Sequence, residues 1–154
     1  MFTDRPGLTD LVECHLKLKD DRPFEQAAYR IPEAIKPDVE RQLFQLLREG
    51  IIRESESNVS CPLVIVKKRD GSLQFCGNYN ALNERLVDDH YISSNPVEII
   101  ANAGGAKHIS MIDLRSEYWQ IPLAEESRRL TVFTTPRKLY EWNVLKSDQN
   151  FLKG

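Results

Sequence analysis

Asp113 is the residue of this sequence whose surroundings most clearly indicate chemistry. It follows the short, mostly apolar stretch 109–112 and precedes a polar turn and the aromatic pair Tyr118 and Trp119. A β-strand that ends in an acid presents a carboxylate to a cleft, and carboxylate oxygens are ligands that Mg²⁺ prefers. Asp is also favoured as the N-cap of a helix, so the residues alone leave both roles open. Tyr118 and Trp119 likewise fit either a site or core packing.

Short clusters of basic residues are the candidates for contacts to phosphate groups. The net charge of −2 shows no global affinity for nucleic acid, so any such contact must be local. Each cluster could equally be a solvated surface, which is the common role of surface charge. The clusters are Lys67-Lys68-Arg69, Arg128-Arg129 and Arg137-Lys138.

Length and composition narrow the class of protein. The 154 residues suffice for one domain or for one lobe of a larger protein, with 41% hydrophobic and 29% charged residues. No apolar run approaches the roughly 20 residues that span a bilayer, and the N-terminus lacks a signal-peptide pattern. The three cysteines have no metal-ligand spacing, which favours a reduced, intracellular setting.

The first third of the chain predicts an extended lead-in and then a helix. Apolar residues alternate with polar ones over Leu11–Leu18, which favours one half-buried strand. Apolar residues recur at helical spacing over Lys36–Glu49, and Gly50 follows as a C-terminal cap. Residues 53–60 are polar and predict a loop.

Two hairpins are predicted on either side of a second helix. The turn Asp70-Gly71 joins β-branched residues 63–66 to a return strand over 72–79, so the basic cluster 67–69 lies at a hairpin tip. A helix from Pro96, capped by Asn95, would use Val97, Ile100 and Ala101 as its inner face and lead into a strand over 107–112. Residues 130–135 and 139–145 form the second hairpin. This mixture of helices and mostly antiparallel strands predicts an α+β fold.

Residues 2–145 resemble the start of the reverse transcriptase region of gypsy-type LTR retrotransposon polyproteins. Five separate motifs match in the same order, which makes the resemblance specific. The motifs are Phe2-Thr3-Asp4-Arg5-Pro6-Gly7; Tyr29-Arg30-Ile31-Pro32; Glu49-Gly50-Ile51-Ile52 with Ser57 and Pro62; Lys67-Lys68-Arg69-Asp70-Gly71-Ser72 with Phe75-Cys76, Tyr79 and Leu82-Asn83; and Asp113-Leu114-Arg115-Ser116 with Tyr118-Trp119-Gln120-Ile121.

The resemblance implies the fingers and part of the palm of a right-hand polymerase. Residues 1–30 would be an extended lead-in, and residues 31–87 the first part of the fingers with the basic hairpin. Residues 88–120 would begin the palm and carry Asp113, and residues 121–145 would be the second part of the fingers. Residues 146–154 match nothing in the family, as though the reading frame were truncated or diverted after Leu145.

The resemblance also assigns roles to individual residues. Asp113 would be the catalytic aspartate and would bind Mg²⁺ together with the carbonyl of Leu114. Nucleotide binding would fall to Lys68 on the triphosphate, to the backbone N–H groups of Ser116 and Glu117, and to Tyr118 as a gate beneath the sugar. Template contacts would come from Asn80 and Asn83. Trp119 is expected to pack in the core.

The complete enzyme would need more than this chain contains. Phosphoryl transfer of this type uses two metal ions roughly 4 Å apart, clamped by several carboxylates. The family supplies the others from a Tyr-x-Asp-Asp motif, which does not occur here. We therefore expect two Mg²⁺ ions in the complete enzyme but not on this chain alone. The implied partners are a template-primer, a dNTP, and the remaining palm, thumb and RNase H segments, with no membrane and with a cytoplasmic or virus-like-particle location.

Several positions depart from the family pattern. Gln74 replaces an arginine that the family uses on the triphosphate, so a bidentate cation becomes a neutral amide. Asn78 and Asn80 stand where the family usually has Asp and Arg. Glu117 replaces a glycine and would crowd and repel a nucleotide, and Gly77 replaces a valine, which is expected to weaken its strand.

Two functions follow as hypotheses. The first is the N-terminal fragment of an RNA-directed DNA polymerase, with template-directed nucleotidyl transfer in the complete enzyme. The alternative is a non-catalytic remnant, either inert or a nucleic-acid-binding or interaction fragment. The absent Tyr-x-Asp-Asp motif predicts that the isolated chain does not polymerise.

Overall fold

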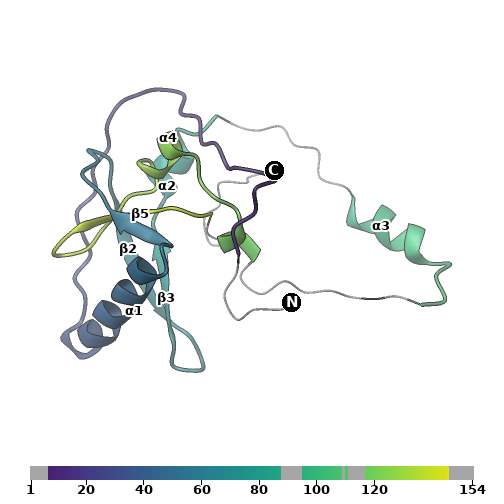
Figure 1. Cartoon of the computed structure of the whole chain (residues 1–154), viewed down its shortest axis with the longest axis horizontal. Coiled ribbons are helices and arrows are strands. Elements are labelled where there is room, and N and C mark those ends of the chain that lie inside the picture. The colour runs from purple at the N-terminus through teal and green to yellow at the C-terminus, as the bar shows by residue number, and fades with distance from the viewer. Residues whose placement is uncertain (1–6, 88–94, 109, 111–116, 146–154) are drawn as a thin grey trace.

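A computed structural model of the chain describes residues 7–87, 95–108, 110 and 117–145. Most of these residues form one body around a five-stranded sheet, while α3 lies apart from that body (Figure 1). Helices and strands are mixed, so the predicted α+β class is confirmed. The elements are η1 (Glu33–Ile35), α1 (Lys36–Arg48), β1 (Ile52–Glu54), β2 (Cys61–Lys67), β3 (Leu73–Gly77), α2 (Asn80–Asn83), α3 (Pro96–Ala103), η2 (Glu117–Gln120), α4 (Glu125–Arg128), β4 (Phe133–Thr134) and β5 (Leu139–Trp142).

Helix α1 forms where the apolar spacing predicts it. Pro37 stands in its first turn, where a missing N–H costs nothing, and Asp38 suits the positive end of the helix dipole. Val39 and Leu43 bury the inner face against the core. The helix ends at Arg48, and Gly50 follows two residues later with a φ of 72°, in the left-handed region that favours glycine.

The sheet has the order β1-β5-β4-β2-β3, so β1 and β3 are its edges. Both predicted hairpins are confirmed, because β2 pairs with β3 and β4 pairs with β5, in each case antiparallel. Strands β2 and β4 pair in parallel, with Cys61 opposite Phe133. This pairing joins the two hairpins into one sheet across more than 70 residues of sequence, and no local pattern predicted it.

The core lies where the second hairpin meets β1 and α1. The ring of Phe133 packs against Tyr140 and Trp142, with ring centroids 5.7 and 5.3 Å away. Ile52 of β1 lies opposite Trp142 and is fully buried. Strand β1 extends to Glu54 and covers this edge of the core. The prediction of a loop over residues 53–60 is therefore wrong for residues 53 and 54.

Residues 8–29, which we call the N-terminal strap, are extended but do not form the strand predicted over Leu11–Leu18. Within Leu11–Leu18 there are only two isolated bridges, Cys14 with Leu123 and Leu18 with Leu86, and a third joins Glu25 to Ser60 later in the strap. A strand requires a continuous partner, and the strap instead meets several segments in turn. Figure 1 shows it running over the top of the sheet body before it reaches α1.

The strap makes backbone hydrogen bonds to chain segments on both sides of residues 88–116. Cys14 donates its N–H to the carbonyl of Pro122 at 2.9 Å. A few residues later, the N–H of Lys19 donates to Arg85 O at 2.7 Å, and the N–H of Val87 donates to Lys17 O at 2.8 Å. One short extended segment thus ties together the two places where the chain leaves and re-enters the sheet body.

Helix α3 begins as predicted but does not bury its predicted inner face. The side chain of Asn95 accepts a hydrogen bond from the N–H of Val97 at 3.0 Å, which caps the helix. Val97 and Ile100 are each 71% exposed, so the inner face predicted from Val97, Ile100 and Ala101 is wrong for the described part of the chain. Periodicity identifies an apolar face but does not supply the surface that covers it.

Candidate nucleotide and nucleic-acid interface

The basic hairpin tip is built by a tight turn between β2 and β3. The N–H of Lys68 donates to Ser72 O at 2.8 Å, and the N–H of Gly71 donates to Lys68 O at 3.0 Å. Gly71 has a φ of 84°, a value that other residues rarely adopt. The side chains of Lys67, Lys68 and Arg69 are all exposed at this tip. The hairpin therefore presents three cations on a backbone whose shape is fixed.

The Asp70 carboxylate stabilises the turn through hydrogen bonds to Ser72. Its Oδ1 accepts hydrogen bonds from the Ser72 hydroxyl at 2.7 Å and the Ser72 N–H at 2.9 Å. These hydrogen bonds, and to a lesser degree the charge of Lys68, lower the pKa of the Asp70 carboxyl. The carboxylate thus remains ionised and bonded over the pH range in which a nucleotide would bind.

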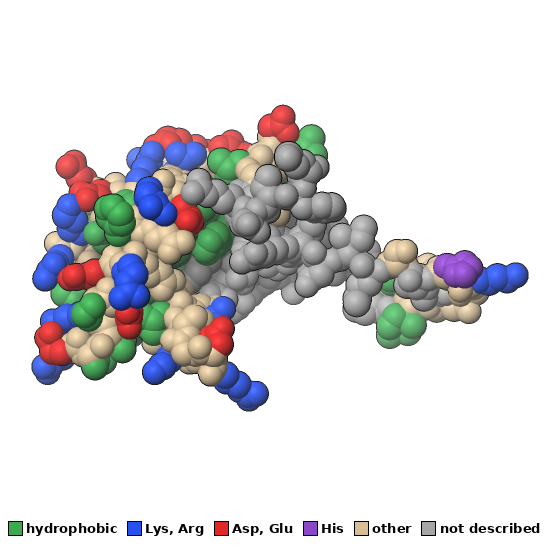
Figure 2. Space-filling model, turned by 60° about the horizontal axis from the view of Figure 1, so that its bottom comes forward, with side chains coloured by type: hydrophobic (Ala, Val, Ile, Leu, Met, Phe, Trp, Pro, Cys, Tyr) green, Lys and Arg blue, Asp and Glu red, His purple; other side chains and the backbone are tan. Residues whose placement is uncertain are grey.

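The other two predicted basic clusters form ion pairs within the fold. Arg128 pairs with Glu125 at 2.8 Å. Arg137 pairs with Glu40 at 2.9 Å, and Lys138 pairs with Glu54 at 2.5 Å. On the face of the sheet body that Figure 2 shows, cationic and anionic side chains are interspersed, without a large patch of one sign. The hairpin tip is thus the basic cluster best placed for phosphate.

The predicted template residues lie on α2, just after β3. Asn80 is exposed, and its N–H lies 3.4 Å from the side-chain oxygen of Asn78. The Asn78 amide in turn donates to the hydroxyl of Tyr29, on the strap, at 3.3 Å. Asn83 is half-buried, and its Oδ1 is buried with no hydrogen-bond partner in the described structure. Both template roles remain predictions, and no local pattern predicted the contact between Asn78 and Tyr29.

The absence of a side chain at Gly77 makes room for the ring of Tyr79. A Cβ at Gly77 would overlap Cε2 and Cζ of Tyr79 and lie 2.6 Å from its hydroxyl oxygen. Tyr79 is buried beneath this strand end, where its hydroxyl donates to Thr131 O at 3.0 Å and accepts from Trp142 Nε1 at 2.9 Å. The glycine therefore admits the ring that joins the hairpin base to the second hairpin.

The predicted catalytic and metal-binding residues fall outside the described residues. Asp113, Leu114 and Ser116 lie in the segment 111–116. The backbone of Glu117 and Tyr118 forms the start of η2, and their side chains are not described. Trp119, which follows them, is partly buried against the core, as predicted.

An ion-pair network with one buried member, Glu141, lies beside the second hairpin, and the sequence did not reveal it. Glu141 on β5 is almost fully buried and accepts from Arg53 Nε at 2.5 Å and from the Ser55 hydroxyl at 2.6 Å. Arg53 also pairs with Glu125, and hydrogen bonds to both carboxylates raise the pKa of its guanidinium. These charges link β1, β5 and α4, so they serve the fold rather than chemistry.

The described residues contain neither a metal-ligand cluster nor a membrane-spanning helix. Within residues 7–87, 95–108, 110 and 117–145, no three His, Cys, Asp or Glu side chains gather to form a possible metal site. Across the same residues, no helix combines the length and the apolar character that crossing a bilayer requires.

Comparison with known proteins identifies the family. Residues 66–151, more than half of the chain, match the family described as reverse transcriptase (RNA-dependent DNA polymerase). The chain belongs to the reverse transcriptase family. The match begins in β2 and includes the hairpin tip and the segment that carries Asp113, as the resemblance predicted. It also extends past Leu145 to Phe151, into the residues that were expected to match nothing in the family.

Relatives of this reverse transcriptase segment come from viruses and transposons. The chain is 36% identical over 114 residues to the enzymatic polyprotein of Cauliflower mosaic virus strain D/H, covering 71% of the chain and 17% of the polyprotein. It is 31% identical over 137 residues to the Pol polyprotein from transposon gypsy of Drosophila melanogaster, covering 85% of the chain and 13% of the polyprotein. The chain thus spans about a sixth or less of these relatives.

A solved structure shows the same fold. The protease–reverse transcriptase of prototype foamy virus, as a CSH mutant, superposes with a TM-score of 0.80 at 25% identity, covering 94% of this chain and 19% of that one. A foamy viral protease–reverse transcriptase in complex with double-stranded DNA superposes with a TM-score of 0.79 at 24% identity, covering 94% of this chain and 25% of that one. The predicted reverse-transcriptase-like fold is confirmed.

Proposed function

We propose that this chain supplies the fingers surface and the first metal-binding aspartate of an RNA-directed DNA polymerase. The observation that carries the proposal is the β2–β3 hairpin tip, where a rigid turn presents Lys67, Lys68 and Arg69 to solvent in a chain of the reverse transcriptase family. Cations on such a tip neutralise phosphate charge, and their positioning orders the reactants. Lys68 would contact the triphosphate of an incoming nucleotide.

The metal chemistry would rest on Asp113 and the carbonyl of Leu114. Both offer oxygen atoms, the donor type that Mg²⁺ prefers, so the residues fit that ion in kind. A pair of ions needs bridging carboxylates beyond one aspartate, and the sequence contains no Tyr-x-Asp-Asp motif. For this chain, binding of nucleic acid and turnover are therefore separable, and only binding is expected.

The experiment measures binding of the purified chain to a primed RNA template over a range of salt concentrations. The variant Lys67→Ala with Lys68→Ala should weaken binding and reduce the slope of log K against log salt by about 0.9 for each lost phosphate contact. The matched control is Lys36→Ala with Arg41→Ala, which removes two cations from α1 and should leave the slope unchanged. Equal losses in both double variants would refute the assignment of the hairpin tip.

A primer-extension assay with Mg²⁺ separates the two hypotheses about turnover. We expect no incorporation by this chain. Incorporation that disappears in Asp113→Asn would show that the chain polymerises by itself, contrary to the proposal. Absence of binding even at low salt would favour the inert remnant over the nucleic-acid-binding fragment.

A further inference from the structure

A concave site unrelated to the hairpin tip lies between α1 and the turn that joins β4 to β5. It has a volume of about 360 Å³, within the range of small-molecule sites. Its lining contains none of the residues to which the family resemblance assigns a nucleotide, template or metal contact. The walls are mainly apolar and come from α1, the β4–β5 turn and β5, together with Ile31. Ile31, Val39, Leu43 and Tyr140 are the buried residues of this lining.

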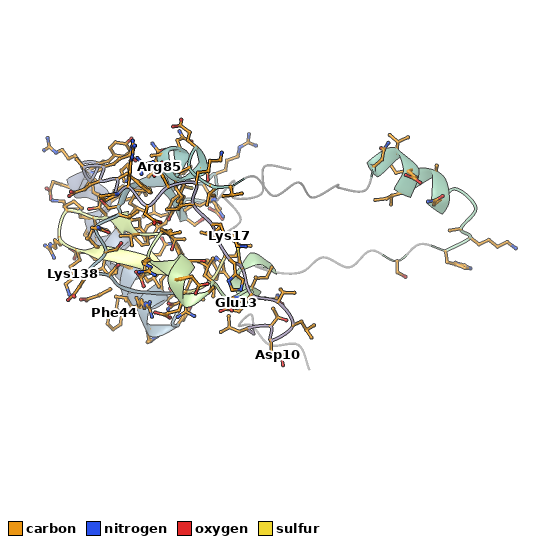
Figure 3. All side chains as sticks on the ribbon, turned by 90° about the horizontal axis from the view of Figure 1, so that it is seen from above. Asp10, Glu13, Lys17, Phe44, Arg85 and Lys138 are labelled. Atoms are coloured by element: carbon orange, nitrogen blue, oxygen red, sulfur yellow. The ribbon has the colours of Figure 1, made fainter. Side chains whose placement is uncertain are left out.

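The mouth of this pocket is polar, and three cations and one carboxylate line it. The cations are Lys36, Arg137 and Lys138, and the carboxylate is Glu40. Lys36 also pairs with the exposed Glu33, which does not line the pocket. Figure 3 shows Phe44 and Lys138 on the same side of the sheet body, and both line the pocket. The side chain of Phe44 is 68% exposed, so it forms an apolar lip next to the cations.

The ion pairs at the mouth do not close the pocket. Arg137 pairs with Glu40 at 2.9 Å, yet the two side chains are 81% and 55% exposed. Lys138 pairs with Glu54, also at the surface, and Glu54 is not part of the lining. Exposed ion pairs contribute little to stability, so an incoming anion exchanges with these carboxylates at low cost.

Tyr140, on β5, also lines the pocket and is buried. Burial raises the pKa of its hydroxyl, so this group adds no charge to the site. An apolar body with one acidic end matches the apolar walls and the cations of this lining. The body covers the aliphatic base and Phe44, and the acid meets the cations at the mouth.

We propose that this pocket binds a small amphiphilic carboxylate, with an aromatic or aliphatic body between α1 and the β4–β5 turn and its carboxylate against Arg137 and Lys138. The site is separate from the nucleic-acid surface proposed above and does not depend on it. Charge complementarity at the mouth excludes cationic amphiphiles and disfavours neutral ones.

The test uses the whole chain and three probes in methyl-selective NMR titrations. Phenylbutyrate carries both the apolar body and the acid, phenylbutanol keeps the body without the charge, and butyrate keeps the acid without the ring. Phenylbutyrate should shift the methyl signals of Val39 and Leu43 with a Kd on the order of 1 mM, as expected for about a dozen non-hydrogen atoms. The other two probes should bind clearly more weakly.

A matched pair of charge reversals locates the carboxylate. Arg137→Glu should raise the Kd of phenylbutyrate by about fivefold, the effect of one exposed charge contact. Arg41→Glu is the control. Arg41 stands on α1, the helix that lines the pocket, but does not line the pocket itself. Like Arg137 it is exposed, at 76%, and ion-paired, to Asp38 at 3.0 Å. Its Kd should stay close to that of the unmodified chain.

Three outcomes would overturn the proposal. The Val39 and Leu43 methyl signals could remain unchanged at high phenylbutyrate concentration, which would show that the pocket stays empty. Phenylbutanol could bind as tightly as phenylbutyrate, which would remove the role of the cations. Arg41→Glu could weaken binding as much as Arg137→Glu, which would reduce the effect to overall charge.

Discussion

Replacing Gly77 by alanine tests the packing at the base of the hairpin. The new Cβ would overlap the ring of Tyr79, which cannot move away because it is buried and its hydroxyl is bonded on both sides, to Thr131 O and Trp142 Nε1. Alanine is ordinarily better than glycine within a strand, so strand propensity alone predicts a small gain. The structure predicts the opposite sign.

The expected loss has two parts. Forcing an extra methyl group into a packed site costs about 2 kcal/mol, and the two hydrogen bonds of the Tyr79 hydroxyl contribute about 1 kcal/mol each. The total is about 4 kcal/mol if the displaced ring loses both hydrogen bonds. Urea unfolding monitored by far-UV circular dichroism measures the free energy of unfolding, and the emission of Trp142 reports on its indole N–H.

A double-mutant cycle separates the two parts. Tyr79→Phe keeps the ring and removes the hydroxyl, so it should cost about 2 kcal/mol. In that background Gly77→Ala should cost only the steric part, about 2 kcal/mol, which gives a coupling energy of about 2 kcal/mol. Gly105→Ala, where an added Cβ meets nothing within 4 Å, is the control and should change stability little. Purely additive costs, or a Gly77→Ala variant as stable as the parent, would refute this account.

Three further predictions concern the fold. Arg53→Met should lower the free energy of unfolding by about 2 kcal/mol, because it leaves the buried Glu141 carboxylate without its cation. Arg137→Met, at an exposed ion pair, should cost under about 0.5 kcal/mol in the same urea titrations. Burial raises the pKa of the Cys61 thiol to about 12, above its ordinary value. Because the unfolded thiol ionises first, stability should fall as the pH rises from the ordinary thiol pKa toward 12, and Cys61→Ala should lose that part of the pH dependence. Ser127→Ala removes the hydroxyl that accepts a strap N–H at 2.8 Å, and faster amide exchange confined to the strap would verify this contact.

Local sequence patterns predicted the elements whose causes are local. The apolar stripe and Gly50 predicted α1 to within one residue of its end, and Asp70-Gly71 predicted the turn of the basic hairpin. The Asn95 cap of α3 was predicted for the same reason, since capping involves residues two positions apart. The family resemblance, which rests on five motifs in order, predicted the fold that the foamy virus structure confirms.

Contacts between distant residues were not predictable from these patterns. The parallel pairing of β2 with β4 and the addition of β1 beside β5 depend on how separate hairpins meet. The short apolar alternation in the strap predicted a strand, but backbone partners on several segments decide its conformation instead. At the candidate site, the hairpin tip stands where predicted, while the roles of Asp113, Ser116 and Tyr118 remain predictions because those side chains lie outside the described residues.

The strap also constrains the order in which the chain can fold during synthesis. It precedes the rest of the sheet body in the sequence, yet Leu16 bonds to Ser127, 111 residues later, and Cys14 bonds to Pro122. The α1 helix and the first hairpin involve nearer residues and can form early, whereas the strap must wait for the second hairpin. Such distant contacts slow folding, so nascent chains that stop before about residue 120 should leave the strap open to proteases while the first hairpin is already protected.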